Sequence, residues 1–274
     1  MNSPLVDQFA RRLIDWFAGF DSCVVAFSGG VDSSVVAKAA HIALGERATA
    51  VTASSASVSA NDLEIAGQVA GFIGIRHEVM TTAEINRPGY VANAPDRCFH
   101  CKSELYTHLT YFQTRDDVEV VVNGANLDDL GDHRPGMQAA RDFKVRSPLI
   151  ECEIDKSMVR ELANLWNLSV WDRPASPCLA SRIAYGVEVT PERLKMVEQA
   201  ESLLRQLGLP DFRVRYHEGD LARLEVPLGE LPRLAAPDLS RRLVAELTDI
   251  GFKYVTLDLG GLRSGSLNQL IQLG

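Results

Sequence analysis

The sequence lacks the features that mark membrane and secreted proteins. No run of about 18 apolar residues occurs in its 274 residues, so we expect no membrane span. The N-terminal residues also lack a basic segment followed by an apolar one, which disfavours a secretory signal. These absences predict a cytoplasmic protein, whose cysteines stay reduced unless they bind a group or react.

The chain also lacks a basic excess, a short-period repeat and any low-complexity segment. Its formal net charge at pH 7 is −8, whereas nucleic-acid-binding proteins usually carry a basic surface or tail. The charge therefore disfavours a nucleic-acid partner. The apolar share of 46% is normal for a globular core, and the length allows one large domain or two ordinary ones.

Two common nucleotide motifs are absent. A Walker A loop needs G-x-x-x-x-G-K-[ST], and Lys38 lies too far along the chain to be its lysine. The dinucleotide fingerprint G-x-G-x-x-G does not occur either. Instead, Ser-Gly-Gly-Val-Asp-Ser at 28–33 joins an apolar run at 24–27, typical of a buried strand, to a helical pattern at 31–44.

This strand, glycine turn and helix predict a phosphate site. A helix start leaves backbone N–H groups unpaired at the positive end of the helix dipole, where an anion binds. The glycine pair lets the anion approach the backbone, serine hydroxyls add donors, and Asp32 is a candidate metal ligand beside the phosphates. We assign six residues to the site: Ser28, Gly29, Gly30, Asp32, Ser33 and Ser34.

Strands and helices alternate through the first two thirds of the chain, which predicts an α/β fold with a doubly wound, mainly parallel sheet. Ligands of such sheets bind at the carboxyl ends of the strands. We predict strands at 24–27, 47–53, 76–81 and 118–122, a fifth ending at 146–149, and helices at 4–20, 31–44, 61–73, 102–111 and 155–168.

A polar loop bracketed by two prolines, residues 171–183, breaks this alternation. We place a domain boundary just after it, which gives a first domain at 1–185 and a second at 186–274. The second domain is predicted to be a small α+β unit. Its expected elements are helices at 191–207 and 239–250, antiparallel strands at 213–217 and 223–226, and a last strand at 254–257.

An acidic loop, residues 123–136, follows the fourth predicted strand. It is either a solvated loop, since Asp and Gly favour turns, or a metal and nucleotide contact; its place at a strand end favours the contact. Lys156 opposes the dipole preference at its helix start, which fits a nearby phosphate or a solvated lysine. The loop candidates are Gly124, Asn126, Asp129 and Arg134, with Asp129 joining Asp32 as a Mg²⁺ ligand.

Five cysteines occur, of which Cys23 and Cys152 are expected to be structural. Cys98 and Cys101 form a Cys-x-x-Cys, which suits a redox pair, a zinc half-site or part of an iron–sulfur site. Cys178 is a third ligand if the fold brings it near. Three thiolates leave one iron of a 4Fe–4S cluster open for a sulfide; zinc with His100 as a ligand, or an inert trio, are the alternatives.

Three segments together resemble one known family. Residues 123–136 are similar to its G-T-N-x-D-D-x-x-D-x-R-P-G segment, with Ala125 in place of Thr. Residues 177–186 are similar to its C-L-A-S-R-I-P-Y-G segment. With the Ser-Gly-Gly-Val-Asp-Ser loop of the N-type ATP pyrophosphatases (PP-loop enzymes), they resemble the LarE-type sulfur transferases, and the resemblance spans nearly the whole chain.

The resemblance implies ATP- and Mg²⁺-dependent adenylation of pyridinium-3,5-dicarboxylate mononucleotide, or of its half-thiolated form. Sulfur then displaces AMP to give a thiocarboxylate on the way to the nickel-pincer cofactor of lactate racemase. In one branch of the family the cysteine at the position of Cys178 is sacrificed and becomes dehydroalanine. In the other, three cysteines hold a 4Fe–4S cluster; this chain has all three, and a homo-oligomer is implied.

The expected substrate contacts lie near Cys178 and in the second domain. Arg213 and Arg215 face one side of a predicted strand, where they either grip the substrate phosphate or form a solvated ion-pair stripe. Arg182 follows Cys178 by four residues, so it is a candidate for lowering the pKa of that thiol. The full set of substrate candidates is Ser181, Arg182, Glu201, Arg213, Arg215 and Glu230.

Three other functions fit parts of the pattern. A tRNA-thiolating PP-loop enzyme shares the loop and the cysteines but conflicts with the acidic charge. An ammonia-using amide synthetase of the same superfamily explains the loop but leaves the cysteine trio without a role. A nucleotide-binding regulator or iron–sulfur carrier would bind ATP without releasing pyrophosphate.

Overall fold

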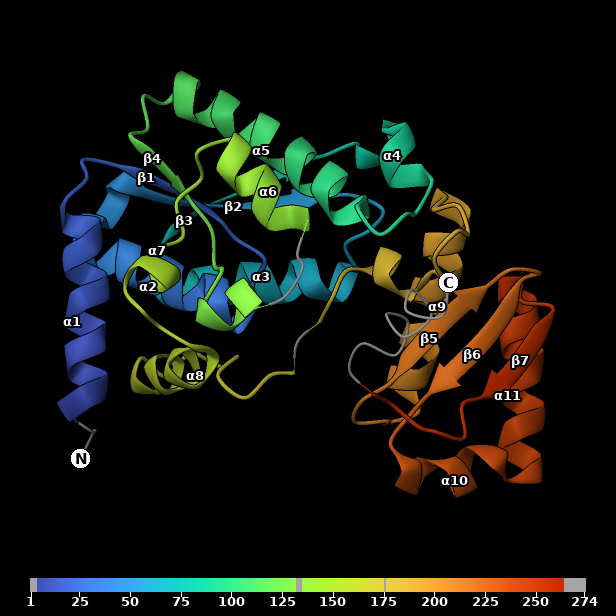
Figure 1. Ribbon diagram of the computed structural model, residues 1–274. Helices are drawn as coiled ribbons and strands as arrows, with labels where there is room; N and C mark the ends of the chain where they lie inside the picture. Colours follow the sequence, from blue (N-terminus) through green and yellow to red (C-terminus); the bar gives the residue numbers. More distant parts are fainter. Residues whose placement is uncertain (1–3, 132–134, 175, 264–274) are drawn as a thin grey trace. The chain divides into compact units, whose positions relative to one another are not determined.

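A computed structural model describes residues 4–131, 135–174 and 176–263, and the chain divides into two compact units (Figure 1). Unit 1 contains residues 1–84 and 98–176, and unit 2 contains residues 85–97 and 177–274. The division thus falls after residue 176, ahead of the boundary expected at 185. The segment 85–97, which lies within the range expected for the first domain, belongs to unit 2.

The sheet of unit 1 is fully parallel, with strand order β3-β2-β1-β4, which confirms the α/β prediction. Its strands are β1 (Cys23–Ala26), β2 (Ala48–Ser54), β3 (Arg76–Thr81) and β4 (Val120–Val122). The fifth predicted strand was wrong. Arg146 forms only a single bridge with Val122, and Pro148, whose fixed φ suits a first helical position, starts the short helix α7 (Pro148–Glu151).

Helices cover both faces of this sheet (Figure 1). Strand side chains alternate between two apolar clusters, with Val25 and Val122 in one and Val24 and Val121 in the other. One face carries α1 (Pro4–Ala18), α2 (Val31–Leu44), α3 (Ala60–Ile73) and α8 (Lys156–Leu165); the other carries α5 (Arg97–Arg115) and α6 (Pro135–Asp142). The doubly wound arrangement follows from this alternation.

Helix α5 begins at Arg97, five residues before the predicted start at 102. Cys98 and Cys101 therefore lie in the first turns of the helix rather than in a loop ahead of it. The other short elements are α4 (Pro88–Val91), η1 (Gly45–Arg47), η2 (Glu84–Asn86), η3 (Leu127–Gly131), η4 (Leu179–Arg182) and η5 (Leu228–Glu230).

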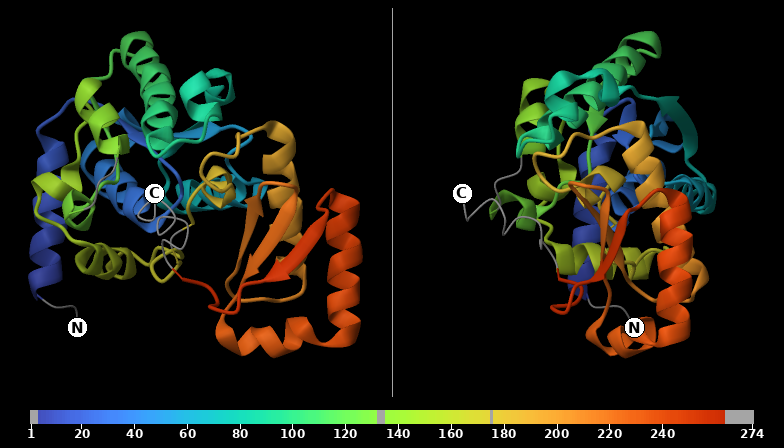
Figure 2. Two further views of the ribbon diagram at one scale, coloured as in Figure 1. Left: turned by 45° about the vertical axis from the view of Figure 1, so that its right-hand side comes forward. Right: turned by 90° about the vertical axis from the view of Figure 1, so that its right-hand side faces the viewer.

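Unit 2 is built on a three-stranded sheet of order β5-β6-β7. Strands β5 (Arg213–His217) and β6 (Leu221–Glu225) are antiparallel, as predicted, and β7 (Tyr254–Leu257) is parallel to β6. Helix α9 (Pro191–Gln206) packs on β5, and α11 (Pro237–Ile250) packs on β7 and against α9 (Figure 2). The short helix α10 (Leu231–Ala235) precedes α11.

Across the described residues, no helix combines the length and the apolar character needed to cross a bilayer.

Candidate active site

The glycine turn after β1 has the conformation that the sequence predicts. Gly29 has a φ of +69°, and a Cβ at this position would lie 2.7 Å from the Ala66 Cα of α3, so only glycine fits. Gly30 is the N-cap of α2 and supplies no side-chain cap. The start of α2 therefore keeps its dipole and its first-turn N–H groups for an anion.

The serine hydroxyls of this turn bind the turn itself. Ser33 and Ser34 donate hydrogen bonds to the Gly30 carbonyl oxygen, at 3.1 and 2.8 Å. Ser28 accepts from the Gly30 N–H at 3.4 Å, and its own N–H donates to Ser33 Oγ at 3.3 Å. These hydroxyls stabilise the conformation of the glycine turn. That they also donate hydrogen bonds to a phosphate stays a prediction.

Asp32, in the first turn of α2, is held by two donors from other elements of unit 1. Lys156 Nζ lies 2.5 Å from its Oδ2, and Asn126 Nδ2 donates to its Oδ1 at 2.9 Å. The sequence marked Lys156 as misplaced at the start of α8 but gave no partner for it. Its partner is Asp32, so this cation stands beside the helix start where phosphates are expected.

The acidic loop packs directly on the start of α2. A Cβ on Gly124 would lie 2.8 Å from the Ser33 backbone nitrogen, so the close approach requires glycine. Asn126 lies between the two predicted Mg²⁺ ligands, because its side chain donates to Asp32 and its N–H donates to Asp129 Oδ2 at 3.0 Å. Asp128 Oδ2 accepts from the N–H of Lys156 at 3.1 Å. Arg134 lies outside the described residues.

These carboxylates suit Mg²⁺, which needs only one or two carboxylates together with waters and substrate phosphates. A ligand set made wholly of protein is not present in the described ranges, where no group of three or more His, Cys, Asp or Glu side chains is placed to hold a metal ion. The Mg²⁺ assignment of Asp32 and Asp129 stays a prediction.

Exposure separates the five cysteines into two groups. Cys23 and Cys152 are buried, and burial raises the pKa of the first thiol to about 12 and of the second to about 11. Both are inert at neutral pH. Cys98 is exposed and Cys101 and Cys178 are partly exposed, which leaves these three thiols able to react or to bind a metal.

Cys178 opens the turn η4 in unit 2, and Arg182 holds that turn. The guanidinium donates to the carbonyl oxygens of Pro177 and Cys178 and, at 3.0 Å, to Ser181 Oγ. It also forms an ion pair with Glu201 at 2.9 Å, and the two side chains are only 4% and 7% exposed. Arg182 and Glu201, both predicted substrate contacts, thus bind each other and the backbone around Cys178.

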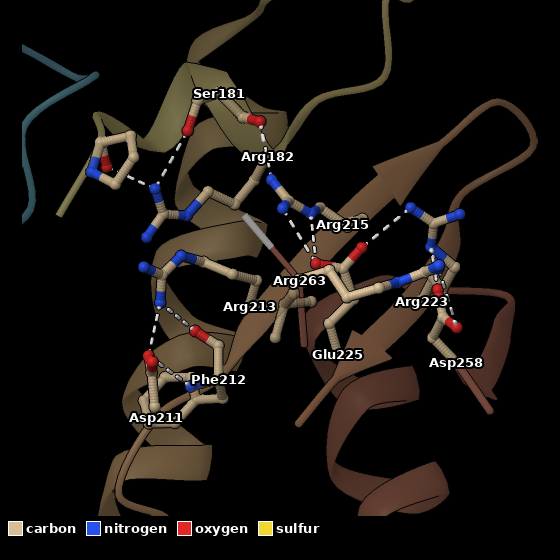
Figure 3. A network of polar contacts seen from close by, with 12 residues as sticks. Ser181, Arg182, Asp211, Phe212, Arg213, Arg215, Arg223, Glu225, Asp258 and Arg263 are labelled. Carbon is tan, nitrogen blue, oxygen red and sulfur yellow. Dashed lines mark hydrogen bonds and ion pairs between the residues drawn. The ribbon is translucent and has the colours of Figure 1, made fainter. Parts of the chain in front are cut away.

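The β5 arginines belong to a larger network of charges (Figure 3). Arg213 pairs with Asp211 at 2.9 Å, whereas Arg215 donates to the Ser181 carbonyl oxygen at 3.0 Å and pairs with the fully buried Glu225. Burial lowers the pKa of the Arg215 guanidinium, although the Glu225 carboxylate acts in the opposite direction. The sequence pattern identified Arg213 and Arg215 but missed this carboxylate.

The missed members of the network lie on β6 and after β7. Arg223 Nη2 binds Glu225 at 3.0 Å, Arg223 Nε lies 3.6 Å from Asp258, and Arg263 lies 4.0 Å from the same carboxylate. Alternation in Arg-x-Glu at 223–225, opposite Arg-x-Arg at 213–215, is the signal that would have revealed Arg223 and Glu225. Glu230, the remaining candidate, pairs instead with Arg233 at 3.1 Å.

Comparison with known proteins connects the glycine turn to nucleotide chemistry. A family model described as NAD synthase matches residues 8–96, which include the turn and the first three strands. A protein of Lactiplantibacillus plantarum named pyridinium-3,5-bisthiocarboxylic acid mononucleotide synthase is 35% identical over 248 residues, covering 90% of this chain and 89% of its own length.

Two relatives named only as uncharacterized proteins also match. One, from Synechocystis, is 43% identical over 267 residues, with 97% of this chain and 99% of its own length covered. The other, from Methanocaldococcus jannaschii, is 32% identical over 174 residues, with 64% of this chain and 67% of its own length covered. The similarity thus extends through both units.

Proposed function

The chain belongs to the family of the LarE-type sulfur transferases, ATP-using enzymes of the PP-loop superfamily, and on that premise we propose its reaction. It adenylates a carboxylate of pyridinium-3,5-dicarboxylate mononucleotide, or of the half-thiolated form, and converts it to a thiocarboxylate. The Lactiplantibacillus relative, which is named as a bisthiocarboxylic acid mononucleotide synthase, supports this substrate class.

The observation that supports the adenylation step is the glycine turn at the start of α2, where no side chain caps the helix. The first-turn N–H groups bind the pyrophosphate portion of ATP, and Lys156 offsets the charge that develops on it as it leaves. Asp32 and Asp129 would hold Mg²⁺, which would supply positive charge to offset that of the phosphates. Lys156 and Asn126 keep the Asp32 carboxylate oriented for this task.

The order of bond changes follows from the chemistry of carboxylates. A free carboxylate is a poor acyl donor because oxide would have to leave. Its oxygen attacks the α-phosphorus of ATP, the bond to pyrophosphate breaks, and the acyl group now carries AMP as a good leaving group. A sulfur nucleophile then forms a bond to the acyl carbon, and the carbon–oxygen bond to AMP breaks. Sulfide gives the thiocarboxylate directly, whereas the Cys178 thiolate gives a thioester that releases the thiocarboxylate when loss of the Cys178 Cα proton breaks the Cβ–S bond and leaves dehydroalanine.

For the sulfur supply we propose Cys98, Cys101 and Cys178 as ligands of a 4Fe–4S cluster. The pair at 98 and 101 has the i, i+3 spacing that places both thiols on one side of α5, and all three residues are at least partly exposed. The donor set therefore fits a cluster with one iron lacking a protein ligand, which would supply a bound sulfide. Without the cluster, Cys178 itself is the catalytic residue and gives up its sulfur.

The second unit is proposed to bind the mononucleotide. Arg213 and Arg215 grip its phosphate, since guanidinium groups bind phosphate oxygens in pairs, and Arg213 keeps a 17% exposed side chain beside its partner Asp211. Three other candidates, Ser181, Arg182 and Glu201, act in or against the Cys178 turn. Glu230, which pairs with Arg233, is proposed as a further substrate contact on the family resemblance alone. A homo-oligomer is proposed on the family resemblance and is checked by light scattering.

The deciding experiment is anaerobic purification followed by iron and acid-labile sulfide analysis of the wild type beside Cys98→Ala. We expect a brown wild type with absorbance near about 400 nm, the region of such clusters, and loss of iron from the variant. A colourless protein, or one holding zinc, contradicts the cluster. A loss of about 34 Da at Cys178 after turnover, the mass of H₂S, then identifies the sacrificial branch.

Two further assays separate the proposed reaction from the rival functions. Pyrophosphate release must depend on the pyridinium dicarboxylate mononucleotide, and Cys178→Ala must abolish thiocarboxylate formation. An amide synthetase would keep its activity in Cys178→Ala, because its nucleophile is ammonia and not a thiol. A tRNA-thiolating enzyme would instead retard bulk tRNA in a gel shift that weakens with salt, and a regulator would bind ATP without releasing pyrophosphate.

A further inference from the structure

Two buried guanidinium groups in unit 2 hold the backbone of the Cys178 turn. Arg182 donates to the carbonyl oxygens of Pro177 and Cys178. The carbonyl of Ala180, on the same turn, accepts a hydrogen bond of 2.8 Å from Arg97 Nη1. Arg97 is only 5% exposed, although it comes from a segment 83 positions earlier in the chain.

Arg97 is itself fixed by Asn93, which lies four residues before it in a turn. The Asn93 Oδ1 accepts from Arg97 Nη1, and its Nδ2 donates to three carbonyl oxygens beyond the turn, of Ile183 at 3.3 Å, Ala184 at 2.8 Å and Val187 at 2.9 Å. Asn93 is fully buried and has a φ of +53°, a conformation that asparagine tolerates better than most residues. Both polar atoms of the Asn93 side chain are therefore held in place by hydrogen bonds.

Backbone hydrogen bonds complete the attachment. The N–H of Val189 donates to the Val91 carbonyl oxygen at 2.9 Å, and the N–H of Gly186 donates to the Asn93 carbonyl oxygen at 3.3 Å. These hydrogen bonds, together with those of Arg97 and Asn93, attach the end of segment 85–97 to residues 180–189. We call this attachment the clamp. Burying a guanidinium costs free energy unless its hydrogen bonds are made. The buried Arg97 side chain is therefore stable only where its hydrogen-bond acceptors are in place.

We propose that Arg97 is a positioning residue for the sulfur supply, which ties the Cys98-x-x-Cys101 helix start to the Cys178 turn. Cys98 directly follows Arg97, and neighbouring Cα atoms are about 3.8 Å apart, so the anchor lies one residue from the first thiol. The inference rests on the proposed function, because it assigns the clamp a role in bringing three thiols together. In this proposal Arg97 supplies no ligand to the cluster but fixes where the start of the cysteine-bearing helix lies.

The test uses cross-linking of the reduced, full-length protein with dibromobimane, which bridges two nearby thiols, followed by peptide mapping. We expect cross-links from Cys98 or Cys101 to Cys178 in the wild type. Arg97→Gln, which removes the charge and most donors, should lower their yield about fivefold, as loss of a hydrogen bond of ordinary strength allows. Arg97→Lys keeps a charged donor and should give an intermediate yield.

Arg241→Gln is the matched control, because the Arg241 side chain is 76% exposed and its ion-pair partner, Asp238 of the same helix, is 97% exposed. Its cross-link yield should equal that of the wild type. Iron bound per chain after anaerobic reconstitution should fall in the same order as the cross-link yield, while ATP affinity stays unchanged in all variants. A purely structural role would instead lower the melting temperature and leave the yield per folded molecule unaltered.

Two results overturn the proposal: no cross-link to Cys178 in the wild type, or an undiminished yield in folded Arg97→Gln. If Arg97→Gln does not fold, Arg97→Lys decides by the same comparison. Because cross-linking needs neither iron nor ATP, it also separates the two proposals. A wild type without iron contradicts the cluster, whereas the position of the thiols is judged by the cross-link alone.

Discussion

The ammonium group of Lys156 lies 2.5 Å from the Asp32 carboxylate, which joins the first turn of α8 to the first turn of α2. A helix N-terminus favours an acid such as Asp32 and disfavours a cation such as Lys156, so this ion pair offsets an unfavourable placement. With side chains 33% and 26% exposed, both groups remain open to an incoming nucleotide. The pair therefore prepares a cation and a metal ligand at one helix start.

Replacing Lys156 should slow adenylation strongly. We expect Lys156→Met to lower the rate of pyrophosphate release about 10²-fold, the usual effect of removing one group that stabilises transition-state charge. Single-turnover pyrophosphate release, measured beside the ATP dissociation constant, is the test. Lys195→Met, at an exposed position of α9, is the control and should be unaffected. An unchanged rate in Lys156→Met would remove the lysine from the mechanism.

Gly124 should tolerate no side chain. A Cβ there would lie 2.8 Å from the Ser33 nitrogen and 3.1 Å from the Asp32 carbonyl carbon, and both are backbone atoms that cannot turn aside. Gly124→Ala must therefore displace the acidic loop from the start of α2. We expect the KM for ATP to rise at least about tenfold, since small misplacements in a site cost this much or more. Steady-state kinetics with ATP varied is the measurement.

Gly67→Ala provides the matched control for that substitution. Gly67 lies in the middle of α3, is exposed, and has no neighbouring atom within 4 Å of the point where a Cβ would lie. Alanine should leave the KM unchanged and raise stability by up to about 1 kcal/mol, because it is the better helix former. If Gly124→Ala behaves like this control, the close packing of the acidic loop does not shape the nucleotide site.

The sequence predicts the core of unit 1 well because its signals are local. Short apolar runs, a glycine pair and amphipathic helices each specify an element without reference to distant residues. The one strand predicted in error, ending at 146–149, failed where Pro148 starts a helix after a single bridging residue. A local pattern indicates that an apolar segment is buried. Whether the segment forms a strand also depends on the neighbouring strand that pairs with it, which lies elsewhere in the chain.

The polar contacts of the candidate site are much harder to predict because they are nonlocal. Asp32 and Lys156 are 124 positions apart, and Asn93 reaches carbonyl groups 90 to 94 positions later. The segment 85–97 has the prolines and glycine typical of a loop, and nothing in its own composition indicates where its polar groups bind. Motif resemblance located the thiols and arginines, whereas their hydrogen-bond partners required the fold.

Cysteine reactivity should divide the thiols as exposure does. At pH 8 brief iodoacetamide treatment should alkylate Cys98, Cys101 and Cys178, while Cys23 and Cys152, with pKa values raised to about 12 and about 11, stay almost wholly protonated. Mass spectrometry of tryptic peptides, with a urea-unfolded sample as control, measures this. Equal labelling of Cys23 in the folded protein would contradict its burial.

The same pKa shift predicts how stability depends on pH. The Cys23 thiol has an ordinary pKa of 9.0, and burial raises it to about 12, so the unfolded chain loses this proton first. Its contribution is fully present below about pH 9 and declines as the pH rises toward 12. Denaturant titrations from pH 8 to 11 should show this decline, and Cys23→Ala should flatten it. A slope that is unchanged in the variant would assign the decline to other groups.

The buried pair of Arg182 and Glu201 should behave differently from the exposed pairs of unit 2. Glu201→Ala leaves the guanidinium buried without its carboxylate and removes an acceptor of the Val214 N–H, so we expect a loss of about 3 kcal/mol or more. Glu246→Ala, which breaks an exposed pair with Arg242, should cost less than about 0.5 kcal/mol.

The three tryptophans, at positions 16, 166 and 171, all lie in unit 1, so their fluorescence does not report on this pair. Hydrogen exchange of the β5 amides gives the local unfolding free energy instead. The double variant Arg182→Met with Glu201→Leu should recover much of the loss, because apolar groups replace both buried charges. If the double variant is no more stable than Glu201→Ala, the apolar replacement gains nothing because Arg182→Met also removes the hydrogen bonds that Arg182 donates to the Cys178 turn, and these bonds contribute as much to the stability of unit 2 as the ion pair does.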